Sequence, residues 1–375
     1  MNLTFTLQLS GIGFLALILS YLGVTVLRRW AEKKEILDLP NERSSHTRPT
    51  PLGGGLAIVV VSLIGFIFTW LLNPPWFLLP FLIYLSSAGI IAAVSWLDDL
   101  HSLPNRIRFS AHCLCAILAI LGFSYFRSVS IPFLGQLHLG WIGLLITFLW
   151  IVYLTNAYNF MDGMDGIDGI DGIDGIDGID GIDGIAGGQA VVAGAGWAAL
   201  GSLSDHPMVA VLGLLLAATS VGFLGHNWPP ARIFMGDVGS AFLGYTFAVL
   251  PVIATAKDPR FVLIGLLLVW PFVFDTTLTF LRRLQKGENV FSAHRSHLYQ
   301  RLVIAGCSHR FVTLIYMGLA LVGTILSLLW FMSVDGSEFA VAIILPLLCL
   351  GLWLFVVYKK KQHAIKQISP TFLTK

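Results

Sequence analysis

Residues 53–72 read GGGLAIVVVSLIGFIFTWLL, a run without a single charged side chain. Crossing a bilayer as an α-helix takes roughly 17–25 mostly apolar residues, so this run predicts one membrane-spanning helix. Similar runs lie on both sides of it. The predicted spans are 9–27, 53–72, 76–96, 110–126, 139–155, 186–203, 208–226, 238–255, 261–281, 312–332 and 339–358. The predicted fold class is therefore an all-α polytopic membrane protein with about eleven transmembrane helices.

The composition supports this architecture. Of the 375 residues, 56% are hydrophobic and only 12% are charged, and the mean hydropathy is +0.80. A soluble protein could not cover its surface with so few charges, which excludes soluble globular, disordered and fibrous proteins. Almost no chain remains for a second domain, so residues 1–375 are treated as one membrane domain. The first span lacks a cationic start and a cleavage site, and we expect a retained helix.

The basic residues fall mostly on one side of the predicted membrane. Of the 23 Lys and Arg residues, all but Arg127, Lys257 and Arg260 lie in loops that follow odd-numbered spans. Cytoplasmic loops carry an excess of Lys and Arg, so the N-terminus is predicted outside and the C-terminus in the cytoplasm. The larger loops are then all cytoplasmic, and we expect any chemistry to face the cytosol.

The first cytoplasmic loop is rich in Pro and Gly and contains Arg43 and His46 before Gly53–Gly55. Backbone N–H groups at the start of the next helix could receive an anion there, and the two cationic side chains could add charge for phosphate. The structural alternative is that these cations only reflect the general excess of Lys and Arg in cytoplasmic loops.

Asp98 and Asp99 begin the second cytoplasmic loop. Two adjacent carboxylates at a membrane border are costly without a cation or donor to hold them. One of them could therefore meet a metal or substrate while the other braces it. The structural alternative is that Asp98 caps the next segment and Asp99 pairs with Arg106 or Arg108.

The third cytoplasmic loop begins at Asn156 and continues through Asn159, Asp162 and Asp165 at three-residue spacing. These side chains offer hard oxygen ligands, which Mg²⁺ prefers together with water and substrate phosphates. The alternative is an ordinary Asn/Asp/Gly-rich turn.

In the fourth loop, Asp237 stands at the start of a span and could ligate Mg²⁺. Gly239 and Ser240 would leave backbone N–H groups for phosphate. The alternative for Asp237 is a helix N-cap.

The fifth cytoplasmic loop contains His294, Arg295, His297 and Arg301 within eight residues. Such a cationic group suits a diphosphate, whereas zinc would need a further Cys or His close by. The alternative is again a loop that follows the charge bias. Asp275 lies inside a span, where an ionisable residue is a functional candidate with a partner still to be found.

Taken together, these loops resemble one family, the bacterial polyprenyl-phosphate N-acetylhexosamine-1-phosphate transferases. The resemblance covers nearly the whole chain, with the motifs in the family's order. The matching residues are Pro40-Asn41, Arg43-Ser-Ser-His46, Gly53-Gly-Gly55, Asp98-Asp99, Asn156-x-x-Asn159-x-x-Asp162-Gly-x-Asp165-Gly, Phe234-Met-Gly-Asp237-x-Gly-Ser240 and His294-x-x-His297-x-Tyr-Gln-Arg301.

The resemblance implies transfer of a sugar 1-phosphate from a UDP-N-acetyl sugar to undecaprenyl phosphate, with release of UMP. It implies Asp237 as the main ligand of Mg²⁺, or of Mn²⁺ in its place, with Asn159 as a second. Asp98 and Asp99 would handle the lipid phosphate or support the metal, and Asp165 would contact the uracil. The implied diphosphate-binding residues are His294, His297 and Arg301.

The HxxHxYQRL pattern of the fifth loop resembles enzymes that start O-antigen or related polysaccharides with GlcNAc, FucNAc or QuiNAc phosphate. The phospho-MurNAc-pentapeptide transferase, a lipid transporter and an inactive scaffold are the alternatives. The expected setting is the bacterial inner membrane, with the active site facing the cytoplasm. The expected partners are the bilayer and the two substrates but no nucleic acid, and a homodimer is left open.

The chain departs from the family pattern at residues 168–185, six copies of Asp-Gly-Ile inserted in the third loop. The insertion leaves two residues that could contact the nucleoside. Asp165 keeps its spacing to the two asparagines, whereas Asp183 precedes Ile185-Ala-Gly187 as the family's second Asp does. We prefer Asp162 and Asp165, and we expect the insert to form a flexible loop or short hairpin because Gly and Ile disfavour a helix. As a hypothesis, changes in copy number tune or silence the protein.

Overall fold

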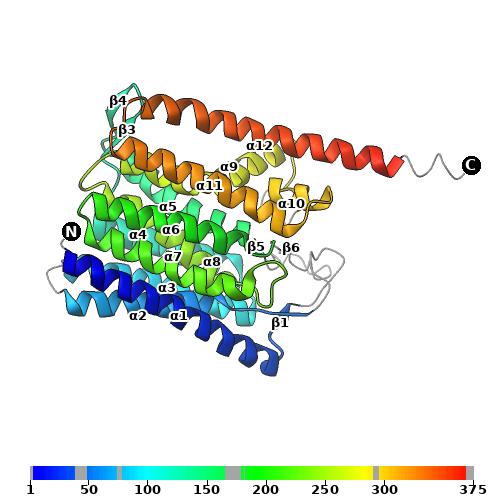
Figure 1. Ribbon diagram of the computed structural model, residues 1–375, viewed down its shortest axis with the longest axis horizontal. Coiled ribbons are helices and arrows are strands. Elements are labelled where there is room, and N and C mark those ends of the chain that lie inside the picture. Colours follow the sequence, from blue (N-terminus) through cyan, green and yellow to red (C-terminus); the bar gives the residue numbers. More distant parts are fainter. Residues whose placement is uncertain are drawn as a thin grey trace, which may run out of the picture.

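The computed structural model describes residues 3–38, 49–73, 78–164, 179–180, 182–289 and 295–368. Within them the chain forms a bundle of long helices (Figure 1). The helices are α1 (Leu3–Lys34), α2 (Gly55–Leu72), α3 (Leu78–His101), α4 (Asn105–Phe123), α5 (Ile142–Asp162), α6 (Ile185–Leu203), α7 (Pro207–Asn227), α8 (Asp237–Ala254), α9 (Phe261–Gln285), α10 (Leu298–Ile304), α11 (His309–Phe331) and α12 (Ser337–Ile368). The strands are β1 (Leu37–Asp38), β2 (Thr50–Pro51), β3 (Ser128–Ile131), β4 (Gly135–His138), β5 (Gly163–Met164) and β6 (Ile179–Asp180), paired antiparallel as β1–β2, β3–β4 and β5–β6.

Ten helices in the described part of the chain are long and apolar enough to cross a membrane, which confirms the predicted all-α polytopic architecture. They are α1 to α5, α7 to α9, α11 and α12. Large hydrophobic side chains on their outer faces, such as Phe14, Leu121 and Leu347, are more than half exposed. Lipid tails match such a surface.

The remaining predicted span, 186–203, forms α6, which lies against α7. A Cβ atom on Gly201 would lie 2.3 Å from the backbone nitrogen of Ala210, and one on Gly194 would lie 2.7 Å from that of Ala217. Small residues are what allow two helix backbones to approach so closely in a membrane. The Gly- and Ala-rich composition that makes this segment less apolar therefore reflects its packing.

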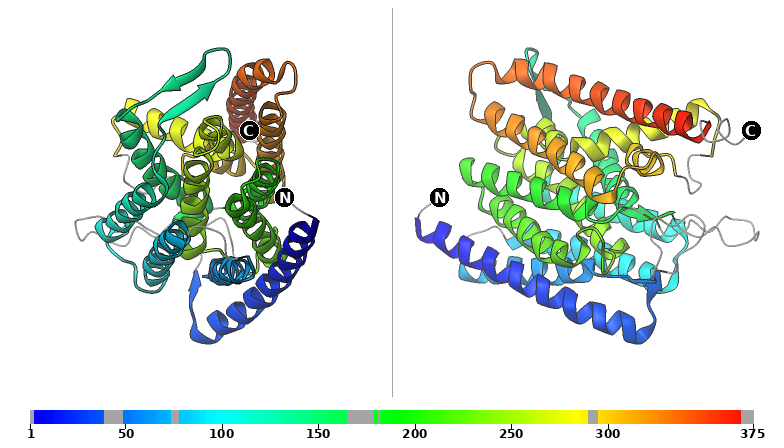
Figure 2. Two further views of the ribbon diagram at one scale, coloured as in Figure 1. Left: turned by 90° about the vertical axis from the view of Figure 1, so that its left-hand side faces the viewer. Right: turned by 45° about the vertical axis from the view of Figure 1, so that its right-hand side comes forward.

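The central helix is α8, which contacts α2, α3, α5 and α9. All its residues from Asp237 to Ala254 are buried, and the end-on view of Figure 2 shows it inside the bundle. A helix enclosed on all sides is apolar all round. Its enclosure fixes the position of its N-terminal residue, Asp237, relative to the ends of the neighbouring helices.

Among the helices that extend further than the sequence predicted, α3 and α5 carry candidate site residues. α3 continues through Asp98 and Asp99 to His101, because no Gly or Pro lies between Gly89 and Pro104. α5 continues through Asn156 and Asn159 to Asp162 and ends where Gly163 takes a positive φ of 112°. These polar residues therefore project from the last turns of helices and not from loops.

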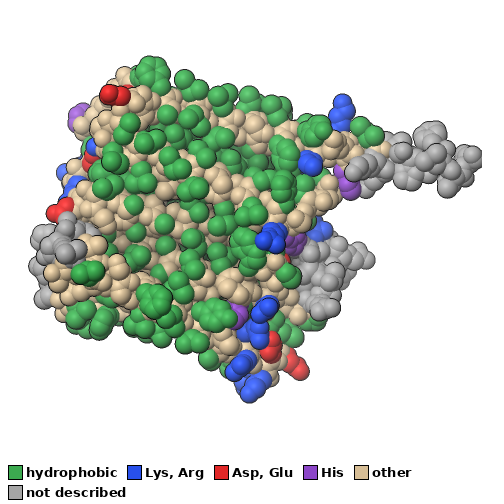
Figure 3. Space-filling view, in the orientation of Figure 1, with side chains coloured by type: hydrophobic (Ala, Val, Ile, Leu, Met, Phe, Trp, Pro, Cys, Tyr) green, Lys and Arg blue, Asp and Glu red, His purple; other side chains and the backbone are tan. Residues whose placement is uncertain are grey.

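Charged side chains lie mainly at the two ends of the bundle, with a broad hydrophobic surface between them (Figure 3). In the view shown, more Lys and Arg side chains lie at the right-hand end, toward which α12 extends beyond the other helices. The side of the membrane on which each end lies stays a prediction from the charge bias.

Candidate active site

The last turns of α3 and α5 meet the first turn of α8 in a polar cluster. Asp237 is 5% exposed, and its Oδ1 accepts a hydrogen bond of 2.7 Å from Asn159 Nδ2. The same Nδ2 donates to Ser240 Oγ over 2.9 Å. Asp98, also buried, interacts directly with the Asp237 carboxyl group. The structure thus brings together Asp98, Asn159 and Asp237, which lie in three separate parts of the sequence.

Arg108 of α4 joins the two buried carboxyl groups. Its Nη1 donates to Asp98 Oδ2 over 2.6 Å and to Asp237 Oδ2 over 2.9 Å, while its Nη2 donates to Asn105 Oδ1. Two close carboxylates repel each other unless they share a cation. From the sequence, Arg108 was only an alternative partner of Asp99, and its recorded ion pairs are with Asp98 and Asp237. Arg108 is instead the counter-ion of Asp98 and Asp237.

The oxygen atoms of this cluster fit a hard divalent cation. Asp98, Asn159 and Asp237 offer carboxylate and amide oxygens from three helices, and Mg²⁺ takes few protein oxygens and keeps several waters. The described residues contain no group of three or more His, Cys, Asp or Glu suited to a metal, and a cation at this cluster would have two carboxylates and one amide as protein donors. A cation bound here would compete with Arg108 for the same carboxylate oxygens.

Asp99 has a different role from Asp98. Its Oδ1 accepts from the backbone N–H of Asp237 over 2.7 Å, and its Oδ2 accepts from that of Val238 over 3.1 Å. A carboxylate at a helix N-terminus satisfies unpaired N–H groups and the helix dipole. Asp99 therefore braces the first turn of α8.

The expectation that Gly239 and Ser240 leave backbone N–H groups for phosphate is wrong. Both N–H groups donate to Gly236 O over 3.2 Å, because they belong to the first turn of α8. With Asp99 on the two preceding N–H groups, the start of α8 is already occupied by groups of the chain itself. Asp237 is also not the N-cap, a position held by Gly236.

Gly54 and Gly55 likewise donate their N–H groups to the chain itself and not to an anion. Gly54 N donates to Phe234 O over 2.9 Å, and Gly55 N donates to Met235 O over 2.8 Å. A Cβ atom on Gly55 would lie only 2.4 Å from Gly239 Cα. The start of α2 therefore docks against the segment that leads into Asp237, and only glycine permits this contact.

His112 and Asn156 adjoin the cluster. His112 of α4 is buried, and its Nδ1 has no hydrogen-bond partner among the described residues. It lies beside Asn156 of α5, whose Nδ2 donates to Val152 O over 2.7 Å. His112 belongs to none of the sequence motifs quoted above. It could have been found from its spacing of four residues from Arg108, which places both side chains on one face of a helix.

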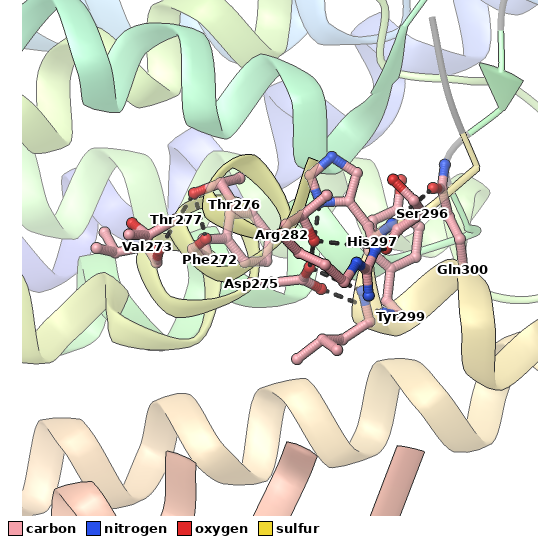
Figure 4. Close-up of polar contacts among 12 residues, drawn as sticks. Phe272, Val273, Asp275, Thr276, Thr277, Arg282, Ser296, His297, Tyr299 and Gln300 are labelled. Atoms are coloured by element: carbon pink, nitrogen blue, oxygen red, sulfur yellow. Dashed lines mark hydrogen bonds and ion pairs between the residues drawn. The ribbon is translucent and has the colours of Figure 1, made fainter. Parts of the chain in front are cut away.

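A second polar cluster surrounds Asp275 of α9 (Figure 4). This carboxyl group is fully buried and is contacted by the His297 ring and by the backbone at the start of α10. The adjoining segment is held by Arg282, which donates to Ser296 O. The partner of Asp275, unknown from the sequence, is therefore the segment that contains the HxxHxYQR motif.

Beside this segment lies a cavity of about 380 Å³ between α9, α10 and α12. Its lining includes six Lys and Arg side chains, with Glu288 as the one acid. The basic residues around it are Arg282, Arg283, Lys286, Arg295, Arg301, Lys360 and His363. Burial and the nearby Arg282 lower the pKa of Arg301, which shows how closely the positive charges are gathered. The structure thus places the predicted Arg295 and Arg301 in one cationic pocket, named here the α9–α12 pocket.

Lys360 and His363 of α12 were not predicted as site residues. From the sequence, the C-terminal cations served only as evidence that this end of the chain is cytoplasmic. No local motif marks them, because they reach the pocket through the fold. Of the other predicted site residues, Asp162 is half-buried at the end of α5. Four lie outside the described residues, namely Arg43, His46, Asp165 and His294.

Comparison with known proteins covers the helices that form the first cluster. Residues 81–179 and 172–255 match the model of glycosyl transferase family 4 in two segments that overlap inside the repeat. Over 321 residues, the chain is 29% identical to a probable undecaprenyl-phosphate N-acetylglucosaminyl 1-phosphate transferase of Bacillus subtilis, with 84% of this chain and 83% of that protein covered.

Two further relatives are similar over comparable lengths. The decaprenyl-phosphate N-acetylglucosaminephosphotransferase of Mycobacterium tuberculosis is 28% identical, with 82% of this chain and 79% of that protein covered. The undecaprenyl-phosphate alpha-N-acetylglucosaminyl 1-phosphate transferase of Yersinia pestis is 29% identical, with 80% and 79% covered. The family model and these relatives support membership of glycosyl transferase family 4.

Proposed function

We propose that this membrane protein transfers an N-acetylhexosamine 1-phosphate from a UDP-sugar to undecaprenyl phosphate and releases UMP. The main support is the buried cluster of Asp98, Asn159, Asp237 and Arg108, which lies in the segment matched to the family. The names of the relatives favour a polyprenyl phosphate as acceptor and N-acetylglucosamine as the first sugar to test. The product would start O-antigen or a related envelope polysaccharide at the inner membrane.

The reaction joins two anions. An oxygen of the lipid phosphate forms a bond to the β-phosphorus of the UDP-sugar, the bond from that phosphorus to the bridging oxygen breaks, and this oxygen leaves with UMP. Catalysis of phosphoryl transfer depends mainly on positioning and on neutralising charge. The reaction therefore needs cations close to the phosphates and exclusion of competing water.

The described residues offer groups that meet the first of these needs. Mg²⁺ bound by Asp98, Asn159 and Asp237 would neutralise charge on the diphosphate. Arg108 holds the two carboxylates and balances their charge when the cation is absent. The α9–α12 pocket offers several further cations for a phosphate, next to exposed apolar residues such as Leu284 and Ile304 that a lipid chain could cover.

The test is an assay of UMP release by the purified protein in detergent with Mg²⁺ and undecaprenyl phosphate. The UDP-sugar panel includes UDP-GlcNAc and other UDP-N-acetylhexosamines, together with UDP-MurNAc-pentapeptide to address the peptidoglycan alternative. We expect UMP release with a UDP-N-acetylhexosamine, its loss on chelation, and its recovery with Mg²⁺ or Mn²⁺. Release with the pentapeptide substrate alone would replace this proposal by the peptidoglycan reaction.

A matched pair of variants tests the site itself. Asp237→Asn keeps the shape of the side chain but removes its charge, and we expect it to abolish turnover while the melting temperature is kept. Asp205→Asn changes an Asp in the turn between α6 and α7, at the other end of the bundle, and should turn over normally. Near-normal turnover by Asp237→Asn would remove Asp237 from the proposed site.

A further inference from the structure

The α9–α12 pocket gathers more positive charge than the chain itself neutralises. The acid in its described lining is Glu288. The Glu288 carboxylate pairs with Arg283 Nε over 3.1 Å and lies 3.8 Å from Lys286 Nζ. These two contacts use the negative charge that the described lining contains, and further cations of the pocket remain.

Three of these cations stand without an acidic partner. In the described part of the chain, the side chains of Arg295, Arg301 and Lys360 form no ion pair and have no recorded acceptor. They come from the segment before α10, from α10 itself and from α12. Like charges that share a cavity repel each other, and an anion between them would relieve this repulsion and accept their hydrogen bonds. The arrangement therefore favours an anionic ligand from outside the chain.

The wall that α12 contributes is a continuation of its packing face. Leu352 and Val356 of this helix are 5% and 1% exposed, and α12 contacts α11 and α10. Lys360 follows Val356 at position i+4 and His363 follows it at i+7, which places them on the same face. Figure 1 shows α12 running past the end of α11 and over α10. The helix therefore directs these two side chains toward the protein, where both line the pocket.

The lining suits a phosphate with an aliphatic chain better than a nucleotide. Besides its charged side chains and His363, the described lining consists of Ser296, Ile304, Ala305 and Ala364. It contains no Phe, Tyr or Trp on which a uracil ring could stack, whereas stacking on aromatic side chains is a common means of holding a base. Cations bind phosphate, and small apolar residues can border a hydrocarbon chain.

The pocket also lies where a membrane lipid can reach it. Only 17% of the residues in the apolar stretch of α12 are buried, and outward side chains such as Leu347 and Leu354 are at least half exposed. Ile304, in the wall of the pocket, is 53% exposed. Lys side chains at the end of a spanning helix lie at the level of the lipid headgroups. A lipid beside α12 would therefore hold its phosphate at the level of Lys360.

We propose that the α9–α12 pocket binds the phosphate monoester of the lipid acceptor and that Lys360 of α12 helps to select this ligand. The inference rests on the proposed function for the identity of the lipid. A phosphate monoester carries about 1.5–2 negative charges near pH 7, whereas the phosphodiester of a bulk phospholipid carries one. Three cations without acidic partners match the higher charge. The UDP-sugar then binds elsewhere, toward the cluster around Asp237.

The change Lys360→Glu tests this assignment on the full-length protein in detergent. Undecaprenyl phosphate is titrated without a UDP-sugar, and its dissociation constant is taken from the rise in melting temperature with ligand concentration. We expect the dissociation constant to rise about tenfold or more in Lys360→Glu, because one charge-assisted contact is lost and a like charge is added. Lys361→Glu is the matched control, since Lys361 is exposed and does not line the pocket, and it should bind as the wild type does.

A second variant and two further ligands complete the test. Arg295→Gln removes a cation from another wall of the pocket, and we expect it to weaken binding of undecaprenyl phosphate in the same way. The dissociation constant of UDP-GlcNAc should be equal in the wild type and in Lys360→Glu. Phosphatidylglycerol, a phosphodiester lipid, should bind the wild type more weakly than undecaprenyl phosphate does.

Four results would overturn the inference. Undecaprenyl phosphate could bind Lys360→Glu and Arg295→Gln as tightly as the wild type, or Lys361→Glu could lose as much affinity as Lys360→Glu. Phosphatidylglycerol could bind as tightly with the same dependence on Lys360, or UDP-GlcNAc could be the ligand that Lys360→Glu weakens. If undecaprenyl phosphate binds as expected but no UDP-sugar yields UMP, the proposed function fails while the lipid site stands.

Discussion

Asp98 and Asp99 are adjacent in the sequence, yet the structure gives them separate roles that mutation can distinguish. Asp99 receives the N–H groups of Asp237 and Val238 at the start of α8. In Asp99→Asn one of its two oxygens becomes an NH₂ group. The new NH₂ group is a donor, and it faces a backbone N–H, which is also a donor. One of the two N–H groups, that of Asp237 or that of Val238, therefore loses its acceptor.

The cost follows from two contributions. A buried N–H group without an acceptor costs about 1–3 kcal/mol. Loss of the negative charge at the helix N-terminus adds about 0.3–1 kcal/mol. The sum of about 1–4 kcal/mol corresponds to a fall in melting temperature of roughly 3–15 °C, at about 2–4 °C per kcal/mol. Turnover should fall as well, because the same N–H groups fix the backbone of Asp237.

Asp98→Asn is the comparison. The asparagine oxygen can still accept from Leu103 N, and its NH₂ group can donate to the Asp237 carboxylate that interacts with Asp98 in the wild type. The NH₂ group also replaces the oxygen that accepts from Arg108 Nη1, but that guanidinium is partly exposed and keeps Asp237 as an acceptor, so we expect a smaller fall in melting temperature than for Asp99→Asn. Turnover should fall by about 100-fold or more, the usual scale for one electrostatic group of an active site.

Melting in detergent, followed by intrinsic tryptophan fluorescence, and UMP release measured on the same preparations give both quantities. The reasoning requires a large loss of stability in Asp99→Asn and a small one in Asp98→Asn. A wild-type melting temperature for Asp99→Asn together with lost turnover would refute it, because Asp99 would then act in the chemistry and not as a brace of α8.

Three further predictions concern packing, the pocket and the repeat. Gly55→Ala should lower the melting temperature and turnover, because its Cβ would meet the backbone of Gly239, whereas the control Gly89→Ala places its Cβ in open space and should change neither. Lys360→Glu should raise the KM for one of the anionic substrates about tenfold, while Lys359→Glu, outside the pocket, should not; equal effects would count against the α9–α12 pocket. Deleting residues 168–185 should leave the protein folded and raise UMP release, and unchanged release would end the idea that the repeat tunes the enzyme.

The membrane fold could be predicted from the sequence because hydropathy and length decide it. The helix ends could not, since a polar residue such as Asn159 can continue a helix as well as leave it. For α6, hydropathy alone gives a weak signal, because its glycines make the segment less apolar. The close approach of the α7 backbone explains these glycines.

The residue types of the site were also predictable, but their division of labour was not. Gly55, Asp99 and Ser240 all belong to motifs that suggest phosphate or metal binding, yet their recorded contacts hold the first turn of α8. Backbone N–H groups find acceptors that lie more than a hundred residues away, as Asp99 does for Asp237. Sequence spacing carries no information on such partners.

The repeat leaves two candidates, Asp165 and Asp183, for one predicted contact with the nucleoside. β5 and β6 pair Gly163 with Asp180 and Met164 with Ile179, so the chain just before the repeat lies beside a described part of the repeat. Beyond it, Asp183 is held at the α7–α8 loop and α11, where its carboxylate accepts from Ala231 N over 3.1 Å and lies 3.4 Å from His309 Nδ1.

The described end of the repeat is therefore part of the fold, and the recorded contacts of the Asp183 carboxylate are with Ala231 and His309. The preference for Asp162 and Asp165 as substrate contacts stays a prediction, since Asp165 lies outside the described residues. The family match also divides here, with its two segments overlapping at residues 172–179. Removing six triplets leaves one Asp in place of Asp165 and Asp183. In that shorter chain, the single Asp would have to keep the spacing to the asparagines of α5 and also contact the α7–α8 loop. We therefore expect the deletion to change turnover more than folding.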